Sequence, residues 1–289
     1  MATLTERFVH DIEGFADLPS LPAVLGHLIA TLGRIDASLP EIAEIIGQDP
    51  VLAGRVVRTA NSAALAGKAP VATIRDALMR LGLLTVRRLA LVVSLYSAVP
   101  LRTRHLEHKA FWRHSLGVAH AAQLLAMRAP ERPDDAEPEQ LFLAGLLHDM
   151  GLLVLDTHYS REFAAVREYA TREGVPFCAA EVAALGADHG ELSQLLVAHW
   201  GLPAALGIAI RSHHRLSLAP AAQRWNASVL HLADLLCSQE GLGDLEEGSA
   251  ERVDESAFDA LGLTPETLTP VADDIRAQVD SAAAFVIAG

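Results

Sequence analysis

Apolar residues recur along most of the chain with the spacing of amphipathic helices. Between residues 21 and 32, for example, Leu25, Leu28, Ile29 and Leu32 follow the i, i+3, i+4, i+7 pattern. The same pattern, together with helix-start and helix-stop residues, predicts further helices at 40–47, 50–61, 73–82, 86–99, 107–127, 141–155, 160–173, 189–200, 203–214, around 231–234 and from 265. The apolar segment 86–99 could also form a strand, but its length and its helical neighbours favour a buried helix.

Turn-forming residues separate these helices. Asp49 and Pro50 are typical of an N-cap followed by a first-turn proline, and Asp188 with Glu191 is typical of a capping box. Loops are predicted at 67–70, at 100–107 and most clearly at 129–139, which holds three prolines and a dense set of charges. Because Leu and Ala dominate and β-branched runs are few, the sequence predicts an all-α fold without internal repeats.

The composition allows a large core and argues against disulfides and membrane segments. The chain has 289 residues, 51% of them hydrophobic, which is enough for one or two domains. Cys178 and Cys237 lie too far apart for a clustered zinc site or a disulfide framework, and we interpret both as buried thiols. No signal peptide is predicted, and no uncharged apolar stretch reaches the roughly 20 residues that span a bilayer. A cytoplasmic protein without membrane association is therefore expected.

The charge of the chain is negative overall but unevenly distributed. A net charge of −13 argues against general nucleic-acid binding. Residues 51–105 nevertheless contain nine Lys or Arg and one Asp, a local +8, whereas residues from 240 onward contain twelve acids and two Arg, a local −10. The two regions could neutralise each other or be solvated surfaces. Alternatively, the basic segment docks an anionic partner, and the candidate residues for that role are Arg75, Arg80, Arg87 and Arg88.

The chemistry of the chain is concentrated around His148 and Asp149, which interrupt the apolar run 141–155. A buried, unpaired carboxylate costs several kcal/mol, so Asp149 needs a cation, a metal ion or several hydrogen-bond donors. Possible co-ligands occur along the chain at His114, His189, His213, His214 and Asp234. The alternatives are a hydrogen-bonded core network around Asp149 and, for the His pair at 213–214, compensation of a helix dipole. His231 is a weaker candidate on the same helix as Asp234.

Two stretches of the chain resemble the HD-related output domain (HDOD) family. One is D-P-V-L-A-G-R-V-V-R-T-A-N-S-A at 49–63, followed by T-I-R-D-A-L-M-R-L-G-L-L-T-V-R-R-L-A-L. The other is F-L-A-G-L-L-H-D-M-G-L-L-V-L at 142–155, followed by D-H-G-E-L-S-Q-L-L-V-A-H-W-G-L-P and A-I-R-S-H-H. The resemblance implies an N-terminal helical bundle, 1–105, packed on a core similar to HD phosphohydrolases, 106–240. From their composition, residues 241–289 are expected to form an acidic helical tail packed on the domain. It also implies a regulatory role in bacterial signalling without established catalysis.

The C-terminal half is more distantly similar to the HD-GYP cyclic-di-nucleotide phosphodiesterases. Position by position, the similarity implies that the metal ligands of HD enzymes are His114, His148, Asp149 and Asp234. It implies that His189 and His213 or His214 complete a site for two metals. Such a set of ligands suits one or two ions of Fe, Mn, Zn or Ni, which could polarise a phosphate and activate water.

Two departures from the HD-GYP pattern argue against efficient hydrolysis. Leu152 stands where the pattern has a Lys that would help to bind phosphate, and no G-Y-P follows the His pair at 213–214. We therefore expect a regulatory protein that binds a signalling protein or a nucleotide and retains a metal site that does not support efficient catalysis. The alternative is a metal-dependent phosphohydrolase or cyclic-di-nucleotide phosphodiesterase. The sequence leaves the partner's identity and the oligomeric state open.

Overall fold

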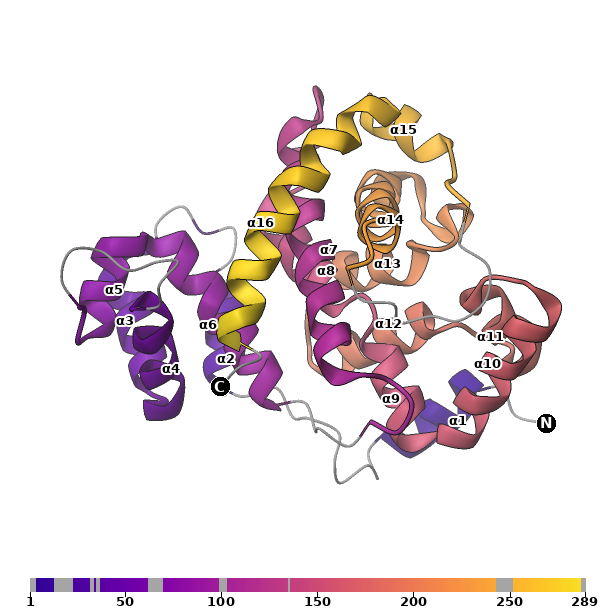
Figure 1. Cartoon of the computed structure of the whole chain (residues 1–289), viewed down its shortest axis with the longest axis horizontal. Coiled ribbons are helices and arrows are strands. Elements are labelled where there is room, and N and C mark those ends of the chain that lie inside the picture. The colour runs from indigo at the N-terminus through magenta and orange to yellow at the C-terminus, as the bar shows by residue number, and fades with distance from the viewer. Residues whose placement is uncertain are drawn as a thin grey trace. The chain divides into compact units, whose positions relative to one another are not determined.

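The computed structural model describes residues 4–12, 23–31, 34, 37–61, 70–98, 103–134, 136–242 and 252–286. Within these residues the chain is helical and has no strand, which confirms the predicted fold class (Figure 1). The chain forms two compact units. Unit 1 comprises residues 1–18 and 101–280, and unit 2 comprises residues 19–100 and 281–289. Unit 2 is thus largely an insertion into the sequence of unit 1.

Unit 2 contains the helices predicted from the first third of the sequence. They are α2 (Ala23–Ala30), α3 (Leu39–Gly47), α4 (Pro50–Ala60), α5 (Ile74–Leu81) and α6 (Leu83–Ala98). The ambiguous apolar segment 86–99 is therefore helical as far as residue 98. Asp49 caps α4 by accepting hydrogen bonds from the backbone N–H groups of Val51 and Leu52. The amide of Asn61, at the end of α4, bonds both backbone groups of Val71 and so fixes the approach to α5. The predicted loop residues 67–69 lie outside the described residues.

The arginines predicted to bind a partner differ in exposure. Arg75 is exposed on α5, whereas Arg80 and Arg88 are partly buried. Arg87 is only 6% exposed, and its Nη1 donates to the carbonyl oxygen of Thr31, just after α2. A guanidinium near the end of a helix satisfies carbonyl groups that lack helical partners. Arg87 therefore joins α6 to α2 inside unit 2 and offers little surface to a partner, while the binding of a partner by these arginines stays a prediction.

We expect Arg87→Ala to destabilise unit 2 by about 2 kcal/mol, since it removes a charged, buried hydrogen bond and the packing of the long side chain. Urea unfolding followed by circular dichroism would measure the change. Arg88→Ala, one residue further along α6 and partly buried, is the matched control and should have the smaller effect. Equal unfolding free energies for both variants would contradict the structural role of Arg87.

Unit 1 contains the remaining helices, three of which were not predicted. They are α1 (Leu4–Asp11), α7 (His108–Arg128), α8 (Pro138–Leu147), α9 (Met150–His158), α10 (Ser160–Glu173), α11 (Phe177–Leu185), α12 (His189–His199), α13 (Ala204–Ser212), α14 (Arg224–Gln239), α15 (Ser256–Leu261) and α16 (Leu268–Val286), the last as far as residue 280. The sequence pattern missed α1, α11 and α15. The core is built around large side chains with almost no exposure, such as Trp112, Phe142 and Phe177.

The first residues of the chain group with unit 1, not with the N-terminal subdomain 1–105 in which the sequence analysis placed them. The cause is local packing. Leu4 and Phe8 are buried, and α1 packs against α12. Arg7 forms an ion pair with Glu162 at 2.9 Å. The C-terminal helices also belong to unit 1 up to residue 280, and Val271 and Ile275 of α16 are fully buried.

Close helix packing in unit 1 depends on a glycine. Helices α7, α8 and α14 lie side by side (Figure 1). A Cβ atom added to Gly145 of α8 would lie 2.7 Å from the backbone of Ala119 in α7. The stretch Pro138–His158 is apolar and long enough to cross a membrane, but 89% of its most apolar part is buried in the protein, as in a core helix. These contacts fix the C-terminal end of α8, where His148 follows.

Candidate metal centre

All seven side chains predicted as metal ligands meet in unit 1. They come from α7 (His114), the α8–α9 junction (His148 and Asp149), the start of α12 (His189), the end of α13 (His213 and His214) and α14 (Asp234). They form three overlapping groups, and within each group the possible ligand atoms lie within 4.8 Å of one another. We call these seven residues the His/Asp cluster. Such groups of imidazoles and carboxylates are able to bind a metal ion.

Asp149 lies between two sets of imidazoles. The helix breaks at this residue, which has φ −103° and ψ 12°, so that His148 and Asp149 both face the cluster. Oδ2 of Asp149 is 3.0 Å from Nε2 of His148 and 3.6 Å from Nε2 of His114. Oδ1 is 3.2 Å from Nε2 of His189 and 3.8 Å from Nε2 of His213. A carboxylate in this position can bridge two cations, each held by different histidines.

Asp234 supplies the second carboxylate of the cluster. Its Oδ1 is 2.9 Å from Nε2 of His114 and 3.7 Å from Nε2 of His148. Its Oδ2 is 3.9 Å from Nδ1 of His214. The other nitrogen of that ring, Nε2, is 2.8 Å from Nε2 of His189. His214 therefore lies between the two halves of the cluster.

Backbone carbonyl groups fix the orientation of three imidazoles. Nδ1 of His114 donates to the oxygen of Leu242 at 3.1 Å, and Nδ1 of His148 to that of Gly145 at 2.8 Å. Nδ1 of His213 donates to a carbonyl oxygen of α13 in the same way. Because a carbonyl oxygen only accepts, each Nδ1 carries the proton, and in a neutral ring the lone pair lies on Nε2, which faces the cluster.

Three atoms that face the centre of the cluster lack hydrogen-bond partners. Among the described residues, the buried polar atoms without a partner include Nε2 of His148, Nε2 of His213 and Oδ1 of Asp149. Leaving such atoms unsatisfied costs about 1–3 kcal/mol each. Lone pairs on imidazole and carboxylate that converge on one region are the arrangement that a metal cation satisfies. The residues present thus fit a divalent metal.

Without a metal, the charges of the cluster are balanced by protons on histidine. Burial opposes a charge on His148, but Asp149 and Asp234 outweigh it and raise the pKa of His148 to about 10. Burial also opposes ionisation of Asp149, yet His148 and His189 hold its pKa well below the ordinary value. Burial and the neighbouring His189 lower the pKa of His214 to about 4. A divalent ion can replace the protons that these histidines carry, so metal binding and proton release are linked.

Glu181 is part of the site and was missed by the sequence analysis. It lies on α11, is 1% exposed, and accepts from Nδ1 of His189 at 2.6 Å and from the backbone N–H of His189 at 3.1 Å. Burial tends to lower the pKa of His189, but the negative charge of Glu181 outweighs burial and raises this pKa well above the usual value. A carboxylate behind a ligand histidine orients the ring and makes it a stronger donor to a metal.

We expect Glu181→Gln to weaken metal binding by about tenfold, because the amide keeps the shape of the side chain but loses its charge. Isothermal titration of the chelator-treated protein with Zn²⁺ would measure the affinity. The control is Glu191→Gln in α12, since Glu191 pairs with Arg215 rather than with an imidazole. Equal zinc affinities for the two variants would show that Glu181 acts only on folding.

His231, the weaker candidate, is not placed as a ligand. Its Nδ1 donates to the carbonyl oxygen of His213 at 2.8 Å, and its Nε2 accepts from the backbone N–H of Asp254 at 2.9 Å. Both ring nitrogens are thus bonded to the backbone. His231 instead positions the turn that carries His213.

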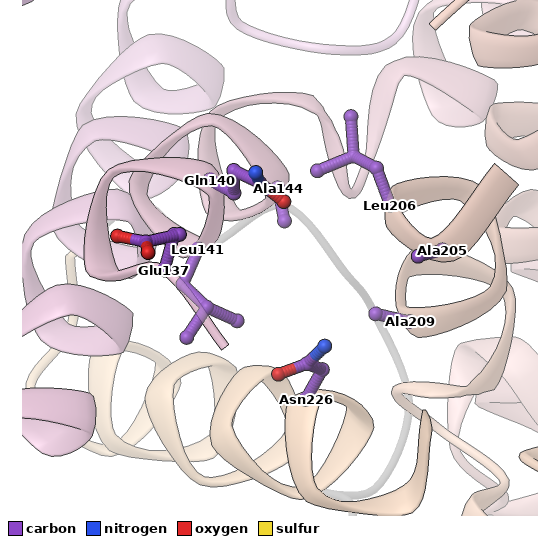
Figure 2. Close-up of a pocket in the computed structure, with 8 residues that line it drawn as sticks. All are labelled: Glu137, Gln140, Leu141, Ala144, Ala205, Leu206, Ala209 and Asn226. Atoms are coloured by element: carbon purple, nitrogen blue, oxygen red, sulfur yellow. The ribbon is translucent and has the colours of Figure 1, made fainter. Parts of the chain in front are cut away.

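The His/Asp cluster is almost closed to solvent. The side chain of Asp234 is 12% exposed, and those of the other six residues are 4% exposed or less. Figure 2 shows a pocket elsewhere in unit 1, between α8, α13 and α14. Its lining residues are Glu137, Gln140, Leu141, Ala144, Ala205, Leu206, Ala209 and Asn226, and none of them belongs to the cluster. This pocket therefore gives no direct access to the candidate ligands.

The surroundings of the cluster offer little to a phosphate. Leu152, at the position where the HD-GYP pattern has Lys, is fully buried and uncharged. Arg215 follows His214 in the sequence, but it is bound by Asp188 at 2.8 Å and by Glu191 at 2.8 Å. Neither Leu152 nor Arg215 therefore offers an unpaired positive charge to the cluster.

Comparison with known proteins identifies the same kind of domain. The model of the HDOD domain family matches residues 18–216. An HDOD domain protein of unknown function from Geobacter sulfurreducens is 27% identical, with a TM-score of 0.77 over 96% of this chain and 95% of that chain. A proposed signal transduction protein from Marinobacter aquaeolei VT8 is also 27% identical, with a TM-score of 0.79 over 95% of this chain and 61% of that chain.

Two further proteins extend the comparison. A proposed phosphohydrolase from Shewanella amazonensis SB2B is 25% identical, with a TM-score of 0.71 over 98% of this chain and 97% of that chain. An uncharacterized protein from Treponema pallidum (strain Nichols) is 26% identical over 204 residues, which are 71% of this chain. The match covers only 39% of the length of that curated relative.

Proposed function

Because the chain belongs to the HDOD family, we propose that it is a regulatory signalling protein whose His/Asp cluster holds one or two divalent metal ions without efficient phosphate hydrolysis. This proposal is carried by two features of the cluster: its ligand atoms are arranged to bind a metal ion, and it is almost closed to solvent. The lone pairs of His148, His213 and Asp149 converge without hydrogen-bond partners, yet the cluster is nearly inaccessible to solvent. Converging ligands hold a small ion once it has entered, whereas a phosphate substrate also needs an open cavity beside the metal.

Two sets of residues would hold two ions. His114, His148 and Asp149 form one group, and Asp149 with the histidines at 189, 213 and 214 forms the other. Bound metal would supply Lewis acidity and a strong local positive charge. The chain's own residues hold the centre in place. Glu181 and the backbone carbonyl groups orient the imidazoles, and the surrounding apolar helices exclude water.

The enzyme alternative is a metal-dependent phosphohydrolase or cyclic-di-nucleotide phosphodiesterase. The position of Asp149 between two histidine groups favours it, because two-metal hydrolases use a carboxylate in this way. The similarity to a proposed phosphohydrolase from Shewanella amazonensis SB2B also favours it. Closure of the cluster and the apolar Leu152 argue against it.

One experiment separates the two functions. The purified chain is analysed for Fe, Mn, Zn and Ni, reloaded with each metal, and assayed with nucleotides, a phosphomonoester and cyclic di-nucleotides. The regulatory proposal expects bound metal and no hydrolysis above the metal-only background. Turnover that disappears in Asp149→Ala would establish the enzyme alternative. Metal-free protein that takes up none of the four ions would refute both.

A regulatory protein of this kind needs a partner. We propose that a signalling protein or a nucleotide binds it, with the basic segment of unit 2 as the contact surface. Arg75 is the exposed member of the four arginines considered, whereas Arg87 is buried. Substitution of Arg75 by Glu is therefore the suitable charge reversal for testing partner binding, because Arg87 holds α6 to α2.

A further inference from the structure

The described stretches that flank unit 2 in the sequence both contact one region of unit 1. Unit 1 is interrupted after residue 18 and resumes at residue 101. The described residues that flank the insertion are 4–12 before it and 103–107 after it. Both stretches are bonded to the C-terminal end of α9 and the first turn of α10.

The returning stretch is held by a buried aspartate. Asp156 has no solvent exposure and accepts backbone N–H groups from Arg104 at 2.8 Å, His105 at 3.0 Å and Leu106 at 3.1 Å. The ring of His105 also lies 3.1 Å from Oγ of Ser160. Three charge-assisted hydrogen bonds from consecutive residues to one carboxylate fix the backbone of this stretch firmly.

The stretch before unit 2, residues 4–12, is held about one helical turn after Asp156, at Tyr159. The hydroxyl of Tyr159 donates to Oδ2 of Asp11 at 3.0 Å. The guanidinium of Arg7 lies 5.0 Å from the centre of the Tyr159 ring and pairs with Glu162. Helix α1 is thereby fixed to the α9–α10 junction (Figure 1). The residues that flank unit 2 on both sides share an anchor at 156–162.

The opposite end of α9 is part of the candidate metal centre. Asp149 immediately precedes the helix. The N–H of Gly151 donates to Oγ of Ser193 at 2.7 Å, and a Cβ at this residue would lie 2.1 Å from the carbonyl oxygen of His189. Residues 150–156 are all buried. At about 1.5 Å per residue, the nine residues of α9 span about 13 Å. One short helix thus joins Asp149 to the anchor.

We propose that α9 couples metal binding to the anchoring of the two stretches of unit 1 that flank unit 2 in the sequence, with Asp156 and Tyr159 as the anchor residues. A packed helix moves as a rigid body, so a shift of Asp149 on metal binding is carried to Asp156. Hydrogen bonds of 2.8–3.1 Å at Asp156 are lost when the partners separate by more than about half an ångström. Metal in the cluster therefore holds the flanking stretches in place, and metal removal loosens them. This inference rests on the proposed function, because the coupling requires that the cluster binds a metal ion.

Hydrogen exchange of the full chain, with Zn²⁺ or with EDTA, tests the coupling. The amides of residues 104–106, which bond Asp156, should exchange about threefold faster or more after zinc removal. Bound zinc, measured on the same sample, with unchanged exchange at 104–106 would overturn the coupling and leave the proposed function intact. Failure to bind zinc or any other divalent ion would remove the proposed function, and the coupling with it.

Two variants distinguish coupling from a merely structural anchor. Asp156→Asn should bind zinc as the native chain does but lose the zinc-dependent difference in exchange at 104–106. Tyr159→Phe removes the bond to Asp11, keeps the ring, and is the milder variant if Asp156→Asn does not fold. It should abolish the zinc-dependent difference at residues 8–12. A zinc-dependent difference that persists in both variants would contradict the assignment of these residues as the anchor.

Discussion

Asn in place of Asp149 is expected to lower the affinity of the chain for a divalent metal by at least about 100-fold. Loss of a residue behind a ligand costs 10–100-fold, and Asp149 itself faces four imidazoles through its two oxygens. The amide has no negative charge, and only one of its terminal atoms can bind a cation. Elemental analysis after gel filtration, and titration with Zn²⁺, would measure the loss.

The matched control for this prediction is Asp188→Asn. Asp188 is also buried and adjoins His189, but its carboxylate accepts from the backbone N–H of Glu191 and from Arg215. This variant should lose some stability and keep its metal. If Asp149→Asn retained the full metal content while remaining folded, the ion would have to be bound elsewhere in the protein, and the proposed function would fail.

The helices and the cluster were predictable because each leaves a local sign in the sequence. Helical spacing and caps such as Asp49 and Asp188 depend only on neighbouring residues, and both side chains cap helices in the structure. The candidate ligands were found because His and Asp are costly in apolar segments without a partner. Similarity to the HDOD family then related positions as distant as His114 and Asp234, which helical spacing alone could not join.

The residues that escaped prediction act through long-range contacts. Glu181 lies in an Ala-rich helix without a clear polar face, so nothing local distinguishes it. The proline at 176 and the glycine at 186, which flank α11, were the only signals for that helix. Asp156 resembles an ordinary helix residue until the backbone at 104–106 is seen to bond it. Charge alone does not reveal that the guanidinium of Arg87 bonds a backbone carbonyl group inside unit 2.

The close approach of α9 to α12 gives the second large effect. We expect Gly151→Ala to reduce the free energy of unfolding of unit 1 by about 3 kcal/mol, at the upper end of the usual cost of overpacking. The new Cβ would lie 2.1 Å from the carbonyl oxygen of His189 and 3.0 Å from Cβ of Leu192. Neither the backbone of α12 nor that of α9 can move without displacing His189 from Asp149. If the Gly151→Ala variant folds, it should therefore also bind zinc more weakly.

Gly54→Ala is the control that separates this clash from the general effect of replacing a helical glycine. Gly54 is exposed within α4, and a Cβ there meets nothing within 4 Å. Alanine should stabilise that helix by about 0.5–1 kcal/mol through its higher helix propensity. Opposite signs for the two substitutions, measured by thermal unfolding, would locate the cost of Gly151→Ala in the contact with His189. If Gly151→Ala unfolded like the native chain and kept its zinc, α9 and α12 would not be packed as closely as the metal centre requires.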